Sequence, residues 1–260
     1  MTRRLRADEL LCLLRAAARD VGPEGAGLAF DGDGTLWAGD VGDDLFFHAL
    51  DRELLVDDAR PHLQRLARQH DLDSGGSTEL LARRIYDAHV QGVVPPPLTY
   101  AMMAWCFAGH SVEHLQAIAR EALAEAGLAA RLHLELTPII DWARSVGMKI
   151  IVVSASPHPV VEVAAAAWGI PPTEIAAVRP ATTPDGRIEP DVSCVVPYGE
   201  RKTRLGRELL GDARWLAAFG DNHFDAAMLC AAELGVAVRP KPALQQLLAQ
   251  LDGVVELVPG

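Results

Sequence analysis

Phe30-Asp31-Gly32-Asp33-Gly34-Thr35-Leu36-Trp37 is the stretch that decides how the rest of the chain is arranged. The apolar run 27–30 is short and is typical of a strand buried on both faces of a parallel sheet. Asp31 and Asp33 stand two residues apart, so in a continuing strand their side chains would share one side and repel each other. The glycines allow the chain to turn out of the sheet instead. In α/β folds, ligands bind in a crevice at this end of the strands.

The paired carboxylates favour a small hard cation, which would relieve their repulsion. Mg2+ prefers one or two protein carboxylates together with phosphate oxygens of a substrate. Asp-Gly pairs are also common in solvated turns. Taken alone, the pair is compatible with a metal site and with an ordinary turn.

Composition limits the class of protein. The chain has 260 residues, of which 50% are hydrophobic, enough for a sizeable core. The net charge of -11 and the absence of a basic stripe argue against nucleic acid or an anionic membrane as partner. No apolar run approaches the length of a membrane span. Arg3-Arg4 is followed by Asp8, Glu9 and Arg15, which interrupt the apolar region of a signal peptide. We expect a cytoplasmic protein, and the sequence leaves the oligomeric state open.

Residues 41–134 form a separate region in the pattern. Apolar residues recur there at helical spacing, prolines and glycines punctuate the series, and no convincing strand is found. We expect an inserted, all-helical domain. Ser111 is a plausible N-cap of one of its helices, and Gly127 is a plausible stop.

The remainder, 1–40 and 135–260, is predicted to form the core. After residue 135, β-branched and apolar strand patterns alternate with helical patterns, and Asp185-Gly186 indicates a hairpin. Such alternation implies a parallel sheet. We therefore predict an α/β fold, a Rossmann-like parallel sheet with helices on both faces. The helical insertion would lie over the carboxyl ends of the strands as a lid.

Polar residues follow other predicted strands. Ser154 ends the strand that begins at Lys149, and Asp221 ends the strand that begins at Trp215. Asp225 stands one helical turn further on, so it would lie back toward Asp221. Helix capping explains these residues as well as a functional site does. Lys202 opens a helix, where a positive charge is unfavourable, which favours a functional reason over a solvated lysine.

Together these segments resemble the haloacid dehalogenase-like superfamily, and within it the phosphoserine phosphatase-like branch. Four motifs stand in the family's order. They are 30–35, Val153-Ser154-Ala155-Ser156, Lys202, and 220–229 with the sequence Gly-Asp-Asn-His-Phe-Asp-Ala-Ala-Met-Leu. The resemblance covers 26–40 and 135–240, and the helical insertion resembles the family's C1-type cap in position only.

The resemblance implies roles for the three aspartates of the site. Asp31 would be the nucleophile and would form an aspartyl-phosphate. Asp33 would protonate the leaving oxygen and then activate water. Asp31, the backbone carbonyl of Asp33, and Asp221 would hold Mg2+.

The resemblance also implies roles for the surrounding polar residues. Ser154 and Lys202 would hold the phosphoryl oxygens, where charge must be stabilised during transfer. Asp225 would orient Lys202 or a metal-bound water. Asp40 stands where phosphoserine phosphatases have a Glu that meets the substrate amine, which predicts a small phosphate ester bearing an amine.

The expected function is therefore a Mg2+-dependent phosphatase that acts on a small phosphorylated metabolite. Dehalogenases of this superfamily lack a carboxylate at the Asp33 position and need no metal, and its transport ATPases carry Thr there. A phosphotransferase or phosphomutase, and a catalytically silent binding protein, are the alternatives. Ala155-Ser156 replaces two glycines of phosphoserine phosphatases, and Phe224 replaces their usual Asn, so the substrate remains open.

Overall fold

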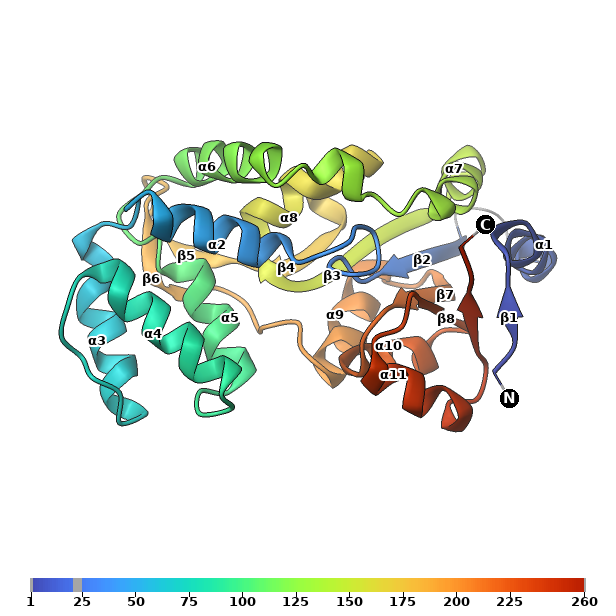
Figure 1. Ribbon diagram of the computed structural model, residues 1–260. Coiled ribbons are helices and arrows are strands. Elements are labelled where there is room, and N and C mark those ends of the chain that lie inside the picture. The colour runs from blue at the N-terminus through green and yellow to red at the C-terminus, as the bar shows by residue number, and fades with distance from the viewer. Residues whose placement is uncertain (1, 21–24, 260) are drawn as a thin grey trace.

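The computed structural model describes residues 2–20 and 25–259, and it has the predicted α/β architecture (Figure 1). Within these residues, seven parallel strands form one sheet in the order β1-β9-β8-β7-β2-β3-β4. Their bounds are β1 Arg4–Leu5, β2 Ala26–Phe30, β3 Lys149–Pro157, β4 Ile175–Val178, β7 Arg214–Gly220, β8 Leu234–Val238 and β9 Val254–Leu257.

Helices cover both faces of the sheet, because successive strand residues point to opposite sides. In β2, Leu28 and Phe30 join one apolar cluster and Ala29 joins another. The first cluster is closed by α1 (Ala7–Ala17), α7 (Thr137–Ser145) and α8 (His158–Ala165). The second is closed by α9 (Glu200–Leu210), α10 (Ala226–Ala231) and α11 (Pro242–Leu247). Burial on both faces explains the continuous apolar runs of the strands.

The insertion between β2 and β3 is helical, as predicted. Its helices are α2 Val41–Asp51, α3 Arg60–Gln69, α4 Thr78–Val90, α5 Pro96–Trp105 and α6 Val112–Glu125. Ser111 caps α6 by accepting a hydrogen bond from the backbone N–H of His114 at 3.1 Å. Helices α2 and α6 pack against α8 of the core and α5 packs against β3, whereas α3 and α4 lie at the end of the molecule away from both termini (Figure 1).

An antiparallel hairpin of β5 (Pro180–Thr182) and β6 (Ile188–Val192) forms around Asp185-Gly186, as the sequence predicts. The hairpin packs against α5, beside which it lies in Figure 1. The backbone N–H of Gly109 also donates to Ile188 O at 3.0 Å. The β5–β6 hairpin, which lies between core elements in the chain, thus packs with the inserted helices. The bounds predicted for core and cap stay predictions.

The shortest helices and strands cannot be recognised from the hydrophobic pattern of the sequence. Strand β1 has two residues, too few for periodicity, and forms because it pairs in parallel with β9. Several predicted helices end in, or begin with, a tighter turn. The 3-10 segments are η1 Ala18–Asp20, η3 Asp57–Ala59, η4 Leu128–Arg131, η5 Leu134–Leu136, η6 Ala166–Trp168, η7 Pro172–Glu174, η8 His223–Asp225 and η9 Leu248–Gln250.

In the described part of the chain, no helix combines the length and the apolarity needed to cross a membrane.

Candidate active site

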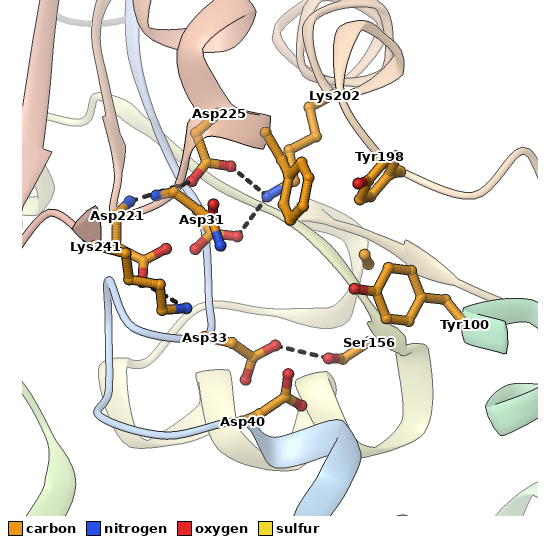
Figure 2. A pocket seen from close by; sticks show the side chains of 13 residues that line it. Asp31, Asp33, Asp40, Tyr100, Ser156, Tyr198, Lys202, Asp221, Asp225 and Lys241 are labelled. Carbon is orange, nitrogen blue, oxygen red and sulfur yellow. Dashed lines mark hydrogen bonds and ion pairs between the residues drawn. The ribbon is translucent and has the colours of Figure 1, made fainter. Parts of the chain in front are cut away.

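A cavity of about 160 Å³ opens at the carboxyl edge of the sheet (Figure 2). The loops after β2, β7 and β8, together with β3, α9 and the segment before α2, form most of its wall, and α5 contributes from the inserted region. The lining residues are Asp31, Asp33, Asp40, Tyr100, Ala155, Ser156, Tyr198, Lys202, Asp221, Asn222, Phe224, Asp225 and Lys241.

Asp31 stands directly after β2 and is 5% exposed. Its backbone N–H donates to Phe219 O at 2.9 Å, which continues the pairing of β2 with β7 and fixes the residue at the cavity. Its Oδ1 accepts a hydrogen bond from Lys202 Nζ at 2.6 Å, and its Oδ2 accepts one from Thr35 Oγ1 at 3.0 Å. Burial, reinforced by the charge of Asp225, raises the pKa of Asp31 well above its usual value, although Lys202 opposes this shift.

Lys202 and Asp225 form a second buried pair, with Nζ 2.6 Å from Asp225 Oδ1. Although burial disfavours the ammonium, the charges of Asp225 and Asp31 raise the pKa of Lys202, so it stays charged. Asp225 Oδ2 accepts from the backbone N–H groups of Asp221 and Asn222 at 3.2 and 2.9 Å. Asp225 thereby fixes both the lysine and the turn that carries Asp221.

Asp33 points into the cavity and is held there by donors from three segments. Its Oδ1 accepts hydrogen bonds from Trp37 Nε1 and the backbone N–H of Val41, both at 2.8 Å. Its Oδ2 accepts from Ser156 Oγ at 2.6 Å, as Figure 2 shows. Ser154 is fully buried behind the cavity, where its Oγ lies 3.4 Å from Asp33 Oδ2 and accepts from the N–H of Ser156 at 3.1 Å.

Asp221 is 2% exposed and lies against the Asp-Gly turn. Gly34 has a φ of +89°, and a Cβ there would fall 1.9 Å from Asp221 Oδ2, so this position requires glycine for both conformation and space. Lys241 Nζ lies 2.8 Å from the same oxygen. Burial raises the pKa of Asp221 to about 6, even though Lys241 opposes the shift.

The donor set fits a hard divalent cation. One carboxylate oxygen from each of Asp31, Asp221 and Asp225 lies within 4.8 Å of the others. Both oxygens of Asp225 and both oxygens of Asp31 already accept hydrogen bonds, whereas Asp221 is paired through Oδ2 alone, so the hydrogen bonds favour Asp221 as a ligand and the ligand role of Asp31 stays a prediction. Five carboxylates line the cavity against two ammonium groups, and burial, with a smaller part from the charge of Asp225, raises the pKa values of Asp31 and Asp221. A cation would offset the excess of carboxylates. The ligand role of the Asp33 carbonyl stays a prediction.

The wall beside Asp40 differs from the rest of the cavity. Asp40 caps α2 by accepting from the backbone N–H of Asp43 at 3.0 Å. Burial, followed by the charge of Asp33, raises its pKa well above the usual value. Across the cavity stand the rings of Tyr100, Tyr198 and Phe224, with centroids 5.8 Å apart for the first pair and 4.4 Å for the second.

The structure brings all seven predicted residues, Asp31, Asp33, Asp40, Ser154, Lys202, Asp221 and Asp225, to this edge of the sheet. Ser154 alone does not line the cavity, where Ser156 takes its place. Sequence reasoning missed Tyr100, Tyr198 and Lys241. Of these, only Lys241 stands out in the sequence, because lysine is rare there: only three of the 24 basic residues are lysines.

Comparison with known proteins gives the family. Residues 28–229 match the model of the haloacid dehalogenase-like hydrolases. No protein of curated function matches the chain. A solved protein of unknown function from Bordetella pertussis Tohama I is 21% identical with a TM-score of 0.67, over 90% of this chain and 99% of that one.

Two further solved structures are similar at lower identity. A HAD family hydrolase from Salmonella enterica subsp. enterica serovar Typhi is 15% identical with a TM-score of 0.56, over 95% of this chain and 76% of that one. A probable phosphoserine phosphatase from Vibrio cholerae is 15% identical with a TM-score of 0.55, over 95% and 68% respectively. At these identities the likenesses show the fold.

Proposed function

Because the chain belongs to the haloacid dehalogenase-like hydrolase family, we propose that it hydrolyses a small phosphomonoester with Mg2+, through an aspartyl-phosphate on Asp31. One observation carries the proposal. The second carboxylate, Asp33, is held in the cavity by Trp37, Val41 and Ser156. A dehalogenase has no use for a proton donor there, whereas an alcohol leaving group needs one.

In the first step, a carboxylate oxygen of Asp31 attacks phosphorus and the bond from phosphorus to the alcohol oxygen breaks. Asp33 in its protonated form gives its proton to the departing oxygen, so the product leaves as an alcohol. Lys202 lies 2.6 Å from Asp31 Oδ1 and would meet the negative charge of the transferring group. The products are the alcohol and a phosphorylated Asp31.

In the second step, water attacks phosphorus and Asp33 takes its proton. The bond between phosphorus and Asp31 breaks, which releases inorganic phosphate and restores both carboxyl groups to their starting states. Mg2+ held by Asp31 and Asp221 would neutralise the phosphoryl oxygens. The buried pairs of Lys202 with Asp31 and Asp225 keep the ammonium in place through both steps.

The leaving group, we propose, carries an amine. Both lysines of the cavity are paired elsewhere, Lys202 with Asp31 and Asp225, and Lys241 with Asp221. Among the described residues, the partly buried carboxylate of Asp40 therefore has no ion pair with either lysine of the cavity. Aromatic rings, which also attract cations, stand nearby at Tyr100 and Tyr198.

The test is a phosphate-release screen over small phosphorylated metabolites, with nitrophenyl phosphate as a generic substrate. We expect release with Mg2+, none after exhaustive chelation, and none from Asp31→Asn. Full activity without a divalent cation would remove Mg2+ from the proposal. Movement of phosphate to a second alcohol without release would favour a phosphomutase or phosphotransferase. Best substrates that all lack an amine would reject the amine preference alone.

A further inference from the structure

Lys241 is a charged group of the cavity that the proposed steps do not use. It follows β8, and its Nζ lies 2.8 Å from Oδ2 of Asp221. The lysine side chain is 52% exposed and its partner 2% exposed. In Figure 2, Lys241 and Lys202 reach the cavity from different sides. The protein thus places an ammonium on a carboxylate expected to bind Mg2+.

The loop that carries Lys241 is built to hold it there. The preceding Arg239 has a φ of +44°, in the left-handed region that non-glycine residues rarely adopt. An ion pair from Arg239 Nε to Glu135 Oε1, at 2.7 Å, fixes this conformation. The backbone N–H of Lys241 donates to Asp221 O at 2.8 Å, so both the main chain and the side chain of Lys241 bind Asp221.

The choice of lysine is itself informative. The chain has 24 basic residues, and only three of them, Lys149, Lys202 and Lys241, are lysines. Two of the three line this cavity. An ammonium is a compact point charge on a flexible stem, whereas the guanidinium of arginine is a broad planar fork. Apart from Lys149, every basic residue outside the cavity is an arginine, and lysine stands at the two cavity positions, where a small, close cation fits.

The two ammonium groups differ in freedom to move. Lys202 has two carboxylate partners and a side chain that is 6% exposed, so it is fixed. Lys241 has one partner and a half-exposed side chain on a flexible stem. Its positive charge faces the Asp221 carboxylate directly. A divalent cation on Asp221 would repel this charge, and a phosphate dianion in the cavity would attract it.

We propose that Lys241 acts as an exchanging cation. It neutralises Asp221 while no metal is bound, and it moves its ammonium to the phosphoryl oxygens when Mg2+ takes over Asp221. Mg2+ then competes with Lys241 in the free protein, whereas phosphate draws the lysine away. The two ligands therefore bind cooperatively. This inference rests on the proposed function, in that the cavity must take both Mg2+ and a phosphate group.

The first test uses the wild-type protein and amine acylation, quantified at each lysine by mass spectrometry. Lys149 serves as an internal reference, since it stands at the far end of β3 and donates to Leu209 O. We expect Mg2+ alone to raise the acylation rate of Lys241 relative to Lys149, because the ammonium is released. Mg2+ with inorganic phosphate should lower it again. A Lys241 rate that does not respond to Mg2+, or that phosphate does not lower, would overturn the exchange.

The second test measures Mg2+ binding by calorimetry, with and without inorganic phosphate. Without phosphate, Lys241→Met should bind Mg2+ at least about tenfold more tightly than wild type, and the tightening caused by phosphate should shrink. Lys241→Arg keeps the charge, and its Mg2+ affinity should lie between those of wild type and Lys241→Met. Lys149→Met, the same change away from the cavity, should match wild type. If Lys241→Met binds Mg2+ more tightly but phosphate tightens Mg2+ binding as much as in wild type, Lys241 only repels the metal, and the exchange is overturned.

Both tests are read without turnover. If no phosphate ester is hydrolysed but Lys241 responds to Mg2+ and phosphate as described, the proposed function fails and the exchange stands. If esters are hydrolysed and Lys241 does not respond, the exchange alone fails.

Discussion

The ammonium nitrogen of Lys202 lies 2.6 Å from Oδ1 of Asp31, although 171 positions separate the two residues in the chain. Both side chains are at most 7% exposed. Asp225 holds the same ammonium at an equal distance. The nucleophile proposed here is thus positioned by a buried ion-pair network rather than by its own loop alone.

Removal of Lys202 should therefore cost stability as well as activity. Lys202→Met leaves Asp31 and Asp225 buried without a cation, and breaking a buried pair in this way typically costs about 3–5 kcal/mol. Urea unfolding at pH 7 without metal measures the loss. Adding Asp225→Asn to Lys202→Met should recover part of it, because one unpaired charge is removed. Equal stability of wild type and Lys202→Met would show that the network is not stabilising.

Asp31→Asn should abolish turnover and leave the fold intact. The amide cannot attack phosphorus, but its oxygen can still accept from Lys202 and its nitrogen can donate to Thr35 Oγ1. Steady-state kinetics and thermal unfolding give the two readouts. A folded variant that keeps a tenth of the wild-type kcat would exclude Asp31 as the nucleophile.

Asp33→Asn should slow the first step by about a hundred- to ten-thousand-fold, the usual cost of losing a general acid–base. The amide keeps the acceptor for Trp37 and Val41, so the side chain should stay in place. The loss should be greater for an alkyl phosphate than for nitrophenyl phosphate, whose leaving group needs little protonation. Single-turnover rates that fall equally for both esters would contradict protonation by Asp33.

Asp40→Asn should lower kcat/KM for an amine-bearing phosphate ester by at least about tenfold, or about 1.4 kcal/mol. A cation in a closed, water-poor site is attracted more strongly than in bulk water. Nitrophenyl phosphate has no cation and serves as the matched control, with little change expected. The cap on α2 should persist, since asparagine also accepts from the Asp43 N–H. Equal losses on both esters would make Asp40 structural.

His158 should make the fold sensitive to acid, independently of the active site. It begins α8, is 6% exposed, and its Nε2 has no hydrogen-bond partner among the described residues. Burial lowers its pKa to about 4, below an unfolded value of about 6.5, so the unfolded chain binds the proton first. Neutral His158 contributes fully to the free energy of unfolding above pH 6.5, and this contribution is lost as the pH falls toward 4. At pH 5 the free energy of unfolding should be lower by about 2 kcal/mol.

Denaturant unfolding from pH 8 to pH 5 measures this effect. His158→Gln cannot take up the proton, so its stability should fall less steeply over that range than the stability of wild type. The comparison uses the slopes and not the absolute stabilities, since the substitution also changes packing. Parallel slopes would assign the acid sensitivity to other groups.

The order of strands and helices could be read from the chain because burial on both sheet faces imposes long apolar runs between helical patterns. The hairpin at Asp185-Gly186 followed from turn chemistry, and the helical insertion followed from its period. Strand β1 could not be found in this way, since its two residues are a strand only because β9 lies beside them.

The sequence by itself determined which strand ends carry Asp31, Asp33 and Asp221, and parallel strands bring such ends to one edge whatever the loops do. Only the tertiary structure decided which side chains complete the cavity. Tyr100 enters because α5 packs over that edge, and Lys241 enters because a left-handed Arg239 turns its loop onto Asp221. These contacts join segments far apart in the chain, and a local pattern of hydrophobic and polar residues encodes strands and helices but not the packing between them.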